Sequence, residues 1–171
     1  MTRAHLHPIP FRAVNVPGTP AYAAGLQRHH ILPRQLIDGE AFAALVETAR
    51  PERLGFHDFR RNGLLLPATE AGAVRIGLPL HRGPHRRYNE MVVERVGQIE
   101  AAWQRGRLRC GEGALREALM RFDLLQKALR RRLLDPRRWG GAPLNRRDPA
   151  LDFSHLDRMA EMLWNGTAPD G

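Results

Sequence analysis

Histidines occur in two pairs along this chain, and imidazole is a side chain that both binds metal ions and exchanges protons near neutral pH. His29 and His30 are adjacent, whereas His81 and His85 are four residues apart. Neighbouring residues of a strand point to opposite faces, so His29 and His30 can serve one site only if the chain kinks or twists between them. The two pairs together favour a shared site over four unrelated, hydrogen-bonded core histidines.

Short strands are expected at and near the first pair. Residues 26–33 have the pattern of a short strand closed by Pro33. Asn62 and Gly63 form a turn signal, followed by a brief apolar run and a proline, which predicts a turn leading into a second short strand. Strands this short cannot form a large sheet. Asn62 joins the histidines as a candidate for the same site.

The second pair lies where a helix is predicted to begin. Pro84 fits the first helical position, where its missing N–H is not needed. Apolar residues then recur at spacings of three and four, which predicts a stripe facing the core: Tyr88, Val92, Val96, Ile99 and Trp103. His85 lies on this stripe and His81 just outside the helix start, so the two can converge. A buried imidazole needs a partner, because an unpaired buried polar group costs about 1–3 kcal/mol.

Helical patterns also cover much of the remaining chain, so the fold is predicted to be α+β and mostly helical. Residues 38–51 form one pattern, with an apolar side made by Phe42, Leu45, Val46 and Ala49. Residues 113–136 form another, with Leu115, Leu119, Phe122, Leu129 and Leu133. Ser154 could cap a last helix that carries Leu156, Met159, Ala160 and Leu163. The first 25 residues, rich in proline and glycine, are expected to run along the surface in extended form.

The charge of the chain favours a polyanionic partner. Its 171 residues suit one ordinary domain, and 27 Lys and Arg against 18 Asp and Glu leave a formal charge of +9. All but Lys127 of the basic residues are arginines, whose planar fork fits phosphate, although a GC-rich genome would also favour arginine codons. Arg34 follows the first strand, and Arg86 and Arg87 lie in the first turn of the predicted helix, where an anion is favoured. These three arginines are candidates for phosphate contact, or else solvated surface charges.

The sequence excludes disulfide bonds within the chain, thiolate metal sites and membrane-spanning segments. Cys110 is the only cysteine, so there is no intramolecular disulfide and no thiolate zinc cluster, and a metal site would rest on His, Asp and Glu. No apolar run is long enough to cross a bilayer, and the N-terminus lacks a secretory signal. We therefore expect no membrane partner, and a chain that is cytoplasmic or exported without a cleaved signal peptide.

Three runs of the sequence together resemble a known nuclease family. They are HHILP, LGFHDFRRNGLLLP and GLPLHRGPHRRYNEMV, which begin at His29, Leu54 and Gly77. In order and approximate spacing they resemble the AHH branch of the HNH/endonuclease VII nucleases, whose core is a strand–strand–helix unit called the ββα-metal or His-Me finger. Arg28 stands where the family name has alanine. The resemblance implies a nuclease core over 26–104, preceded by an extended segment over 1–25 and followed by a packed helical extension over 105–171.

The resemblance also implies a role for each candidate residue. His30 matches the general base that takes a proton from water, and His29 matches a position that binds metal. His85 matches the metal ligand supplied by the helix, and His81 resembles an extra ligand seen in DNase colicins. Asn62 matches the residue that commonly braces the finger and orients the base, with metal contact left open. His57 has no spacing that recommends it as a ligand and is at most an outer neighbour of the site.

These roles predict a metal-dependent endonuclease that hydrolyses phosphodiester bonds, with DNA favoured over RNA. One divalent cation held by neutral imidazoles keeps its full charge for the phosphate. Mg²⁺ or Mn²⁺ would suit the reaction, and Zn²⁺ or Ni²⁺ would also suit the imidazoles. Families of this kind often serve as bacterial toxins paired with an immunity protein, and defence or housekeeping roles are equally compatible with the sequence.

Two other classes of function stay open at this point. A basic nucleic-acid-binding protein could use the four histidines to hold a structural zinc, in a closed tetrahedral site without a free base. Alternatively, the finger could be degenerate and serve only in protein interaction.

Overall fold

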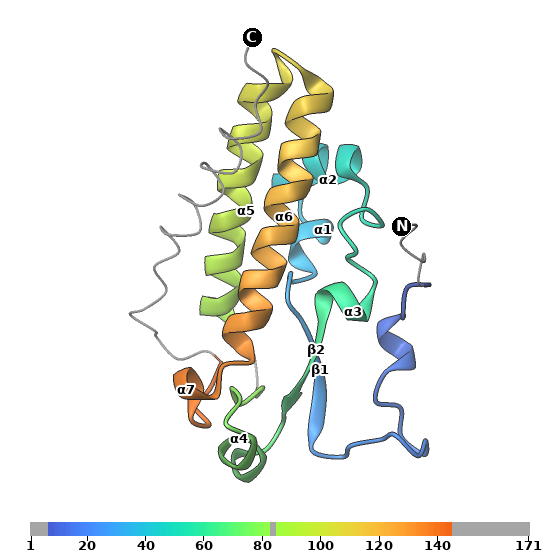
Figure 1. Cartoon of the computed structure of the whole chain (residues 1–171), viewed down its shortest axis with the longest axis vertical. Coiled ribbons are helices and arrows are strands. Elements are labelled where there is room, and N and C mark those ends of the chain that lie inside the picture. The colour runs from blue at the N-terminus through green and yellow to red at the C-terminus, as the bar shows by residue number, and fades with distance from the viewer. Residues whose placement is uncertain (1–6, 83–84, 145–171) are drawn as a thin grey trace, which may run out of the picture.

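The computed structural model describes residues 7–82 and 85–144, and within them the chain is mostly helical with one small sheet (Figure 1). This confirms the predicted α+β class. The sheet is formed by β1 (Leu26–His30) and β2 (Gly63–Pro67). The α-helices are α1 (Gln35–Asp38), α2 (Ala43–Ala49), α3 (Phe59–Asn62), α4 (Glu70–Ile76), α5 (Arg86–Arg107), α6 (Gly111–Leu133) and α7 (Pro136–Trp139). Short 3₁₀ turns cover Phe11–Ala13 and Glu40–Phe42.

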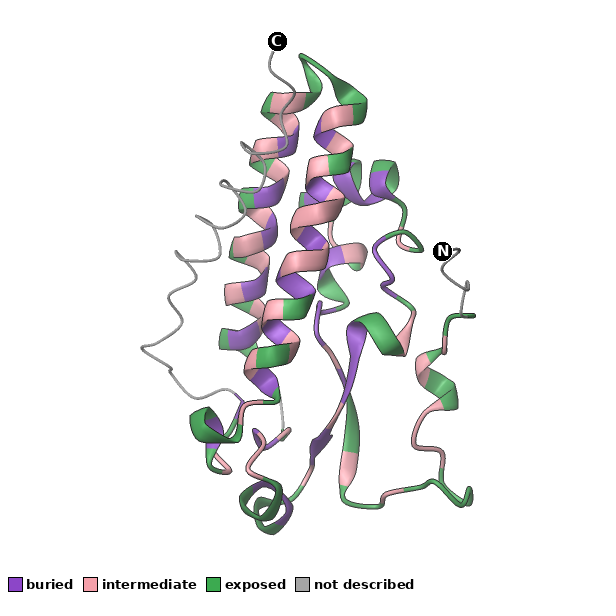
Figure 2. Ribbon diagram, viewed as in Figure 1, coloured by how far each residue is buried: buried purple, intermediate pink, exposed green. Residues whose placement is uncertain are grey.

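Helices α5 and α6 form a long antiparallel pair that supports the rest of the molecule (Figure 1). The predicted stripe on α5 is buried in full, and in Figure 2 it lies on the side facing α6. On α6 the predicted Leu115 and Leu119 are half-buried and pack against the core, and Ala114 and Ala118 are buried as well. The helices approach closely here: a Cβ on Gly106 would lie 3.1 Å from that of Ala114. Small side chains permit this approach.

Strands β1 and β2 are antiparallel, with His29 opposite Leu64 and His30 opposite Gly63. The predicted first strand ends earlier than expected, since Ile31 leaves the ladder and donates its N–H to Asn62 O at 2.8 Å. The expected turn at Asn62 is the end of the one-turn helix α3. Gly63 follows it directly, and a Cβ at this position would clash with the Phe59 ring.

The helix predicted over 38–51 is divided into a 3₁₀ turn and α2. Its predicted core residues are buried: Phe42, Leu45, Val46 and Ala49. It ends before Pro51, where Arg50 adopts a φ of 63°. The residue before a proline is disfavoured in the α conformation, which explains the end of the helix.

The N-terminal segment, from His7 to Gly25, is attached to the sheet and to α3 rather than simply extended along the surface. Phe59 N donates to Ile9 O at 2.7 Å, and Ile9 N donates to the Asp58 carboxylate at 3.1 Å. Further along, the Asn15 amide bonds the backbone of Ala23 and Leu26. Backbone groups therefore fix this segment beside β1, which the proline-rich composition did not predict.

A single hydrophobic cluster runs from Ile31 to Leu144 and includes residues of α2, the sheet, α5, α6 and α7. Arg130 of α6 donates to the carbonyl oxygens of Arg60 and Gly63, at 2.7 and 2.9 Å, and so ties α6 to the start of β2. In the described part of the chain, no helix combines the length and apolar character needed to cross a membrane. Pro84 and the helix predicted after Ser154 lie outside the described residues.

Candidate metal centre and the histidine beside it

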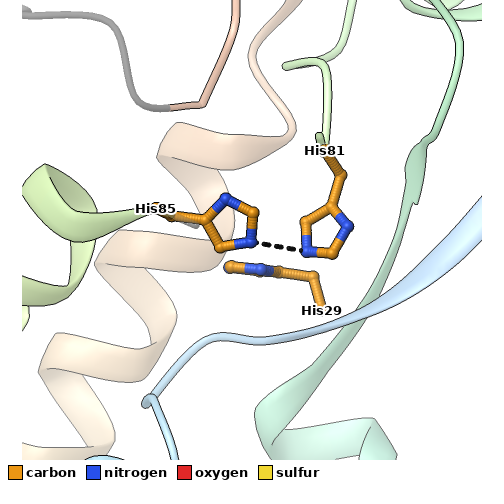
Figure 3. A group of neighbouring side chains, drawn as sticks. All are labelled: His29, His81 and His85. Atoms are coloured by element: carbon orange, nitrogen blue, oxygen red, sulfur yellow. Dashed lines mark hydrogen bonds between the residues drawn. The ribbon is translucent and has the colours of Figure 1, made fainter. Parts of the chain in front are cut away.

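Three imidazoles from separate parts of the chain converge beside the sheet (Figure 3). His29 comes from β1, and His85 is the residue directly before α5. His81 is anchored to β2, because its N–H donates to Pro67 O at 2.8 Å. Nε2 of His81 lies 2.9 Å from Nε2 of His85, and one nitrogen from each of the three rings lies within 4.8 Å of the others.

Burial keeps these imidazoles neutral. It lowers the pKa of His29 well below its usual value, with smaller contributions from His81, His85 and His30. It likewise lowers the pKa of His81 to about 4, with His85 as the second cause, and it lowers the pKa of His85. A metal ion binds only the neutral form of imidazole. The cluster is therefore ready to bind a cation at neutral pH.

The cluster fits a divalent cation. His29 Nε2 is buried and has no hydrogen-bond partner among the described residues, and in Figure 3 the His85 nitrogen that faces His81 is Nε2. Nitrogens bound at about 2.1 Å to one ion lie at most about 4.2 Å apart, so small ring rotations would bring all three rings into range. No fourth His, Cys, Asp or Glu joins this group within 7–82 and 85–144. Three ligands leave coordination positions open, as in catalytic rather than structural metal sites.

Gln27 fixes the orientation of the His81 ring. Its Oε1 lies 3.0 Å from His81 Nδ1, and because an amide oxygen only accepts, Nδ1 carries the hydrogen and Nε2 keeps its lone pair. Sequence reasoning missed this residue. It lies two positions before His29, and alternate residues of a strand share a face, so the signal was available.

Removing this contact should weaken metal binding without changing the fold. We expect Gln27→Ala to reduce affinity for Zn²⁺ about 10- to 100-fold, the usual effect of losing the partner of a metal-bound histidine. Gln27→Glu keeps an acceptor and should retain near wild-type affinity. Calorimetric titration of both variants tests this, and equal affinity in Gln27→Ala and wild type would contradict it.

His30 lies outside the cluster. It is the last residue of β1, still paired with Gly63, so ordinary strand alternation separates it from His29, and the predicted kink between them is wrong. Its ring stacks on Phe11, with centroids 3.8 Å apart and planes at 5°. Burial lowers the pKa of His30 to about 4, helped by the charges of Arg34, His57 and Arg28.

Asn62 braces the chain that follows His30. Its side chain is fully buried, accepts from Leu32 N at 2.7 Å, and donates to the carbonyl oxygens of Leu32 and Phe56 at 3.2 and 3.1 Å. All of these contacts are to backbone, and Asn62 is not a member of the imidazole cluster. Tyr88 supports the same stretch from α5, since its hydroxyl donates to Ile31 O at 2.7 Å.

Loss of the Asn62 amide should therefore destabilise the protein. We expect Asn62→Ala to lower the free energy of unfolding by about 3 kcal/mol, because it leaves buried backbone groups of Leu32 and Phe56 without partners. Urea denaturation measures this change. Asn89→Ala, a substitution of the same type in α5, should change stability by less than about 1 kcal/mol. A loss that small for Asn62→Ala would show that the bracing contacts do not matter.

The candidate arginines lie on two sides of the site. Arg34 lies beside His30, is well exposed, and forms a 3.8 Å ion pair with Asp38. Arg86 and Arg87 are exposed in the first turn of α5, directly after His85. Besides Arg34 and His30, a cavity beside His30 is lined by Phe11, Arg12 and His57. No sequence pattern selected Phe11 or Arg12, and His57 was expected only as an outer neighbour of the site.

Comparison with known proteins agrees with this geometry. Residues 11–121 match the sequence model of the AHH family, described as a nuclease family of the HNH/endonuclease VII superfamily with conserved AHH. The matched range contains all four histidines of the two pairs, Asn62 and Phe11. Neither a curated protein nor a solved structure gives a significant match. The chain therefore belongs to the AHH family of the HNH/endonuclease VII superfamily, a family of nucleases and hence of hydrolases.

Proposed function

We propose that this protein is an endonuclease that hydrolyses phosphodiester bonds of DNA in preference to RNA, with His30 as general base. The observation that carries the proposal is the arrangement of the imidazoles. Three neutral rings converge, while the fourth, adjacent in the same strand, stays outside the cluster. His29 and His30 are nevertheless consecutive residues of β1, so the base would lie next to a metal-binding position.

His29, His81 and His85 would hold one divalent cation. When bound, the cation would stabilise the charge that develops on the phosphate and on the departing 3′-oxygen. Imidazole ligands favour Zn²⁺ and Ni²⁺ in affinity, whereas Mg²⁺ and Mn²⁺ keep waters and suit phosphate chemistry. We propose Mg²⁺ or Mn²⁺ as the working ion.

His30 would accept the proton of the attacking water on an imidazole nitrogen. Its low pKa ensures that the ring is neutral, and so able to accept a proton, throughout the neutral range. An anionic phosphate beside it would raise this pKa towards the operating pH, since an opposite charge favours the imidazolium form. Arg34, Arg86 and Arg87 are proposed to contact phosphates on either side of the site.

Phe11 is proposed to position His30, because parallel stacking holds the imidazole in one plane. We expect Phe11→Leu to lower kcat about tenfold by loosening this placement, with little change in metal affinity. Phe11→Tyr keeps the ring and should retain wild-type kcat. Steady-state kinetics of the two variants tests the role, and equal kcat in Phe11→Leu and wild type would contradict it.

A structural zinc site in a non-catalytic binding protein is less well supported. That function needs a closed set of four ligands, and the group of described residues contains three. For the cellular role we propose a toxin or a defence nuclease. A toxin would need an immunity protein as its partner.

Cleavage assays on plasmid DNA and on RNA test the proposed function. Wild-type protein should cut with Mg²⁺ or Mn²⁺ and not in EDTA, and His30→Ala and His85→Ala should both be inactive. His7→Ala is a matched control, because His7 is exposed and the hydrogen bond that it forms with Arg60 uses its backbone oxygen, which the substitution keeps. Cleavage that persists in EDTA, or that is absent from wild type with every divalent ion, would overturn the proposal.

A further inference from the structure

A cavity of about 370 Å³ adjoins His30 on the side where Phe11 lies. Pockets of roughly 300–1,000 Å³ that combine apolar walls with a few polar groups are typical of sites for small ligands. The apolar walls here come from the N-terminal segment and from the core: Pro10, Phe11, Ile37 and Phe56. The proposed function uses His30, Phe11 and Arg34 from its lining but assigns no ligand to the cavity itself.

The walls of the cavity are fixed by contacts on both sides. Phe11 is stacked on His30 and also meets the Phe59 ring edge-on, with centroids 5.1 Å apart. Arg28 donates to Phe11 O at 2.9 Å. Phe56, on the opposite side, is 2% exposed. The cavity is therefore a preformed site and not a gap beside a loose chain end.

The polar part of the lining is cationic. Arg12 and Arg34 contribute guanidinium groups, His30 and His57 contribute imidazoles, and among the described residues no carboxylate lines the cavity. The Arg34 side chain is 70% exposed and lies 3.8 Å from Asp38, whose side chain is 59% exposed. An exposed ion pair of this kind is weak, so Arg34 can turn to a phosphate, which its planar fork fits.

We infer that this cavity binds one unpaired nucleobase of the substrate, from a nucleotide next to the phosphate that is cleaved, with Arg12 and Arg34 on that nucleotide's phosphate. The inference rests on the proposed function, since it requires His30 to meet the scissile phosphate. A nucleobase has flat faces suited to the apolar walls, and its phosphate suits the cationic rim. A paired base reaches such a cavity only after leaving the stack, whereas a single strand presents it directly. The preferred substrate is therefore single-stranded nucleic acid.

Binding to the metal-free protein tests the inference independently of catalysis. In EDTA, 2′-deoxyadenosine 5′-phosphate should bind at least tenfold more tightly than deoxyribose 5-phosphate or inorganic phosphate, as measured by calorimetry. Ile37→Trp fills the cavity and should abolish this advantage, while Leu108→Trp, at an 84% exposed position after α5, should not. Arg12→Gln, an exposed substitution that leaves the core intact, should weaken binding of all three compounds. Equal binding of the nucleotide and of phosphate by wild type would overturn the inference.

Cleavage of matched oligonucleotides tests the substrate class. With Mn²⁺, wild type should cut a single strand at least tenfold faster than the same sequence as a duplex, and an abasic residue beside the cleaved bond should remove most of this difference. Ile37→Trp should lose the preference while retaining metal affinity. Equal cleavage of both forms, unchanged in Ile37→Trp, would overturn the inference and leave the nuclease proposal standing. Absence of all cleavage by wild type would instead refute the nuclease proposal, and the binding result would still decide whether the cavity takes a nucleobase.

Discussion

Substitution of His30 by alanine is expected to lower kcat for phosphodiester cleavage by about 100- to 10,000-fold, the range contributed by a positioned general base. The affinity for Mn²⁺ or Zn²⁺ should stay within about twofold of wild type, because His30 lies outside the group of converging imidazoles. Single-turnover cleavage and calorimetric metal titration on the same preparation measure the two quantities. The separation of the two effects distinguishes a general base from a ligand.

His7→Ala serves as the control for this experiment, and it should leave both quantities unchanged. A parallel loss of metal affinity in His30→Ala would show that the ring is a ligand and would contradict the division of roles between His29 and His30. Normal cleavage by His30→Ala would exclude it as the base.

Substitution of His85 by alanine should have the second large effect, on metal-dependent stability. A ligand that binds only the folded state stabilises that state by about 2.7 kcal/mol when its concentration is 100 times its Kd. Excess Zn²⁺ should therefore raise the melting temperature of the wild-type protein. We expect His85→Ala to lower affinity about 100-fold or more, since even partners of metal ligands contribute 10- to 100-fold. The shift in melting temperature should then largely disappear.

The metal-free protein provides the control for His85. Its Nδ1 is buried without a partner among the described residues, and an unpaired buried polar group is unfavourable. His85→Ala also removes the 2.9 Å contact of Nε2 with His81, so the two losses oppose each other and the variant should unfold in EDTA at a temperature close to that of wild type. A strong loss of stability in EDTA, together with retained metal binding, would identify His85 as a structural core residue and contradict its role as a ligand.

The regular elements of the fold were predictable because their burial follows helical periodicity. The stripe on α5 from Tyr88 to Trp103 was predicted in full, and so was the apolar side of α2. On α6, Phe122, Leu129 and Leu133 are buried as predicted, and Ala114 is buried too because the two helices approach closely beside Gly106. Periodicity identifies an apolar side, but the distance to the neighbouring helix decides which residues lie at its centre.

The candidate site was predictable only where the spacing of residues in the sequence determines how close their side chains lie. The convergence of His81 and His85 follows from their separation at a helix start, and the resemblance to the family added His29 to them. Phe11 could not be predicted, because its position depends on hydrogen bonds between Ile9 and the residues around α3, which are distant in sequence. Long-range backbone contacts of this kind leave no local pattern.

Anomalous diffraction from crystals of the protein soaked in Zn²⁺, recorded at the zinc absorption edge, tests the central claim most directly. We predict one strong peak bonded to nitrogens of His29, His81 and His85, with open positions filled by solvent and with the His30 ring not bonded to the ion. A peak ligated by His30, or no peak among the three converging rings, would contradict the account.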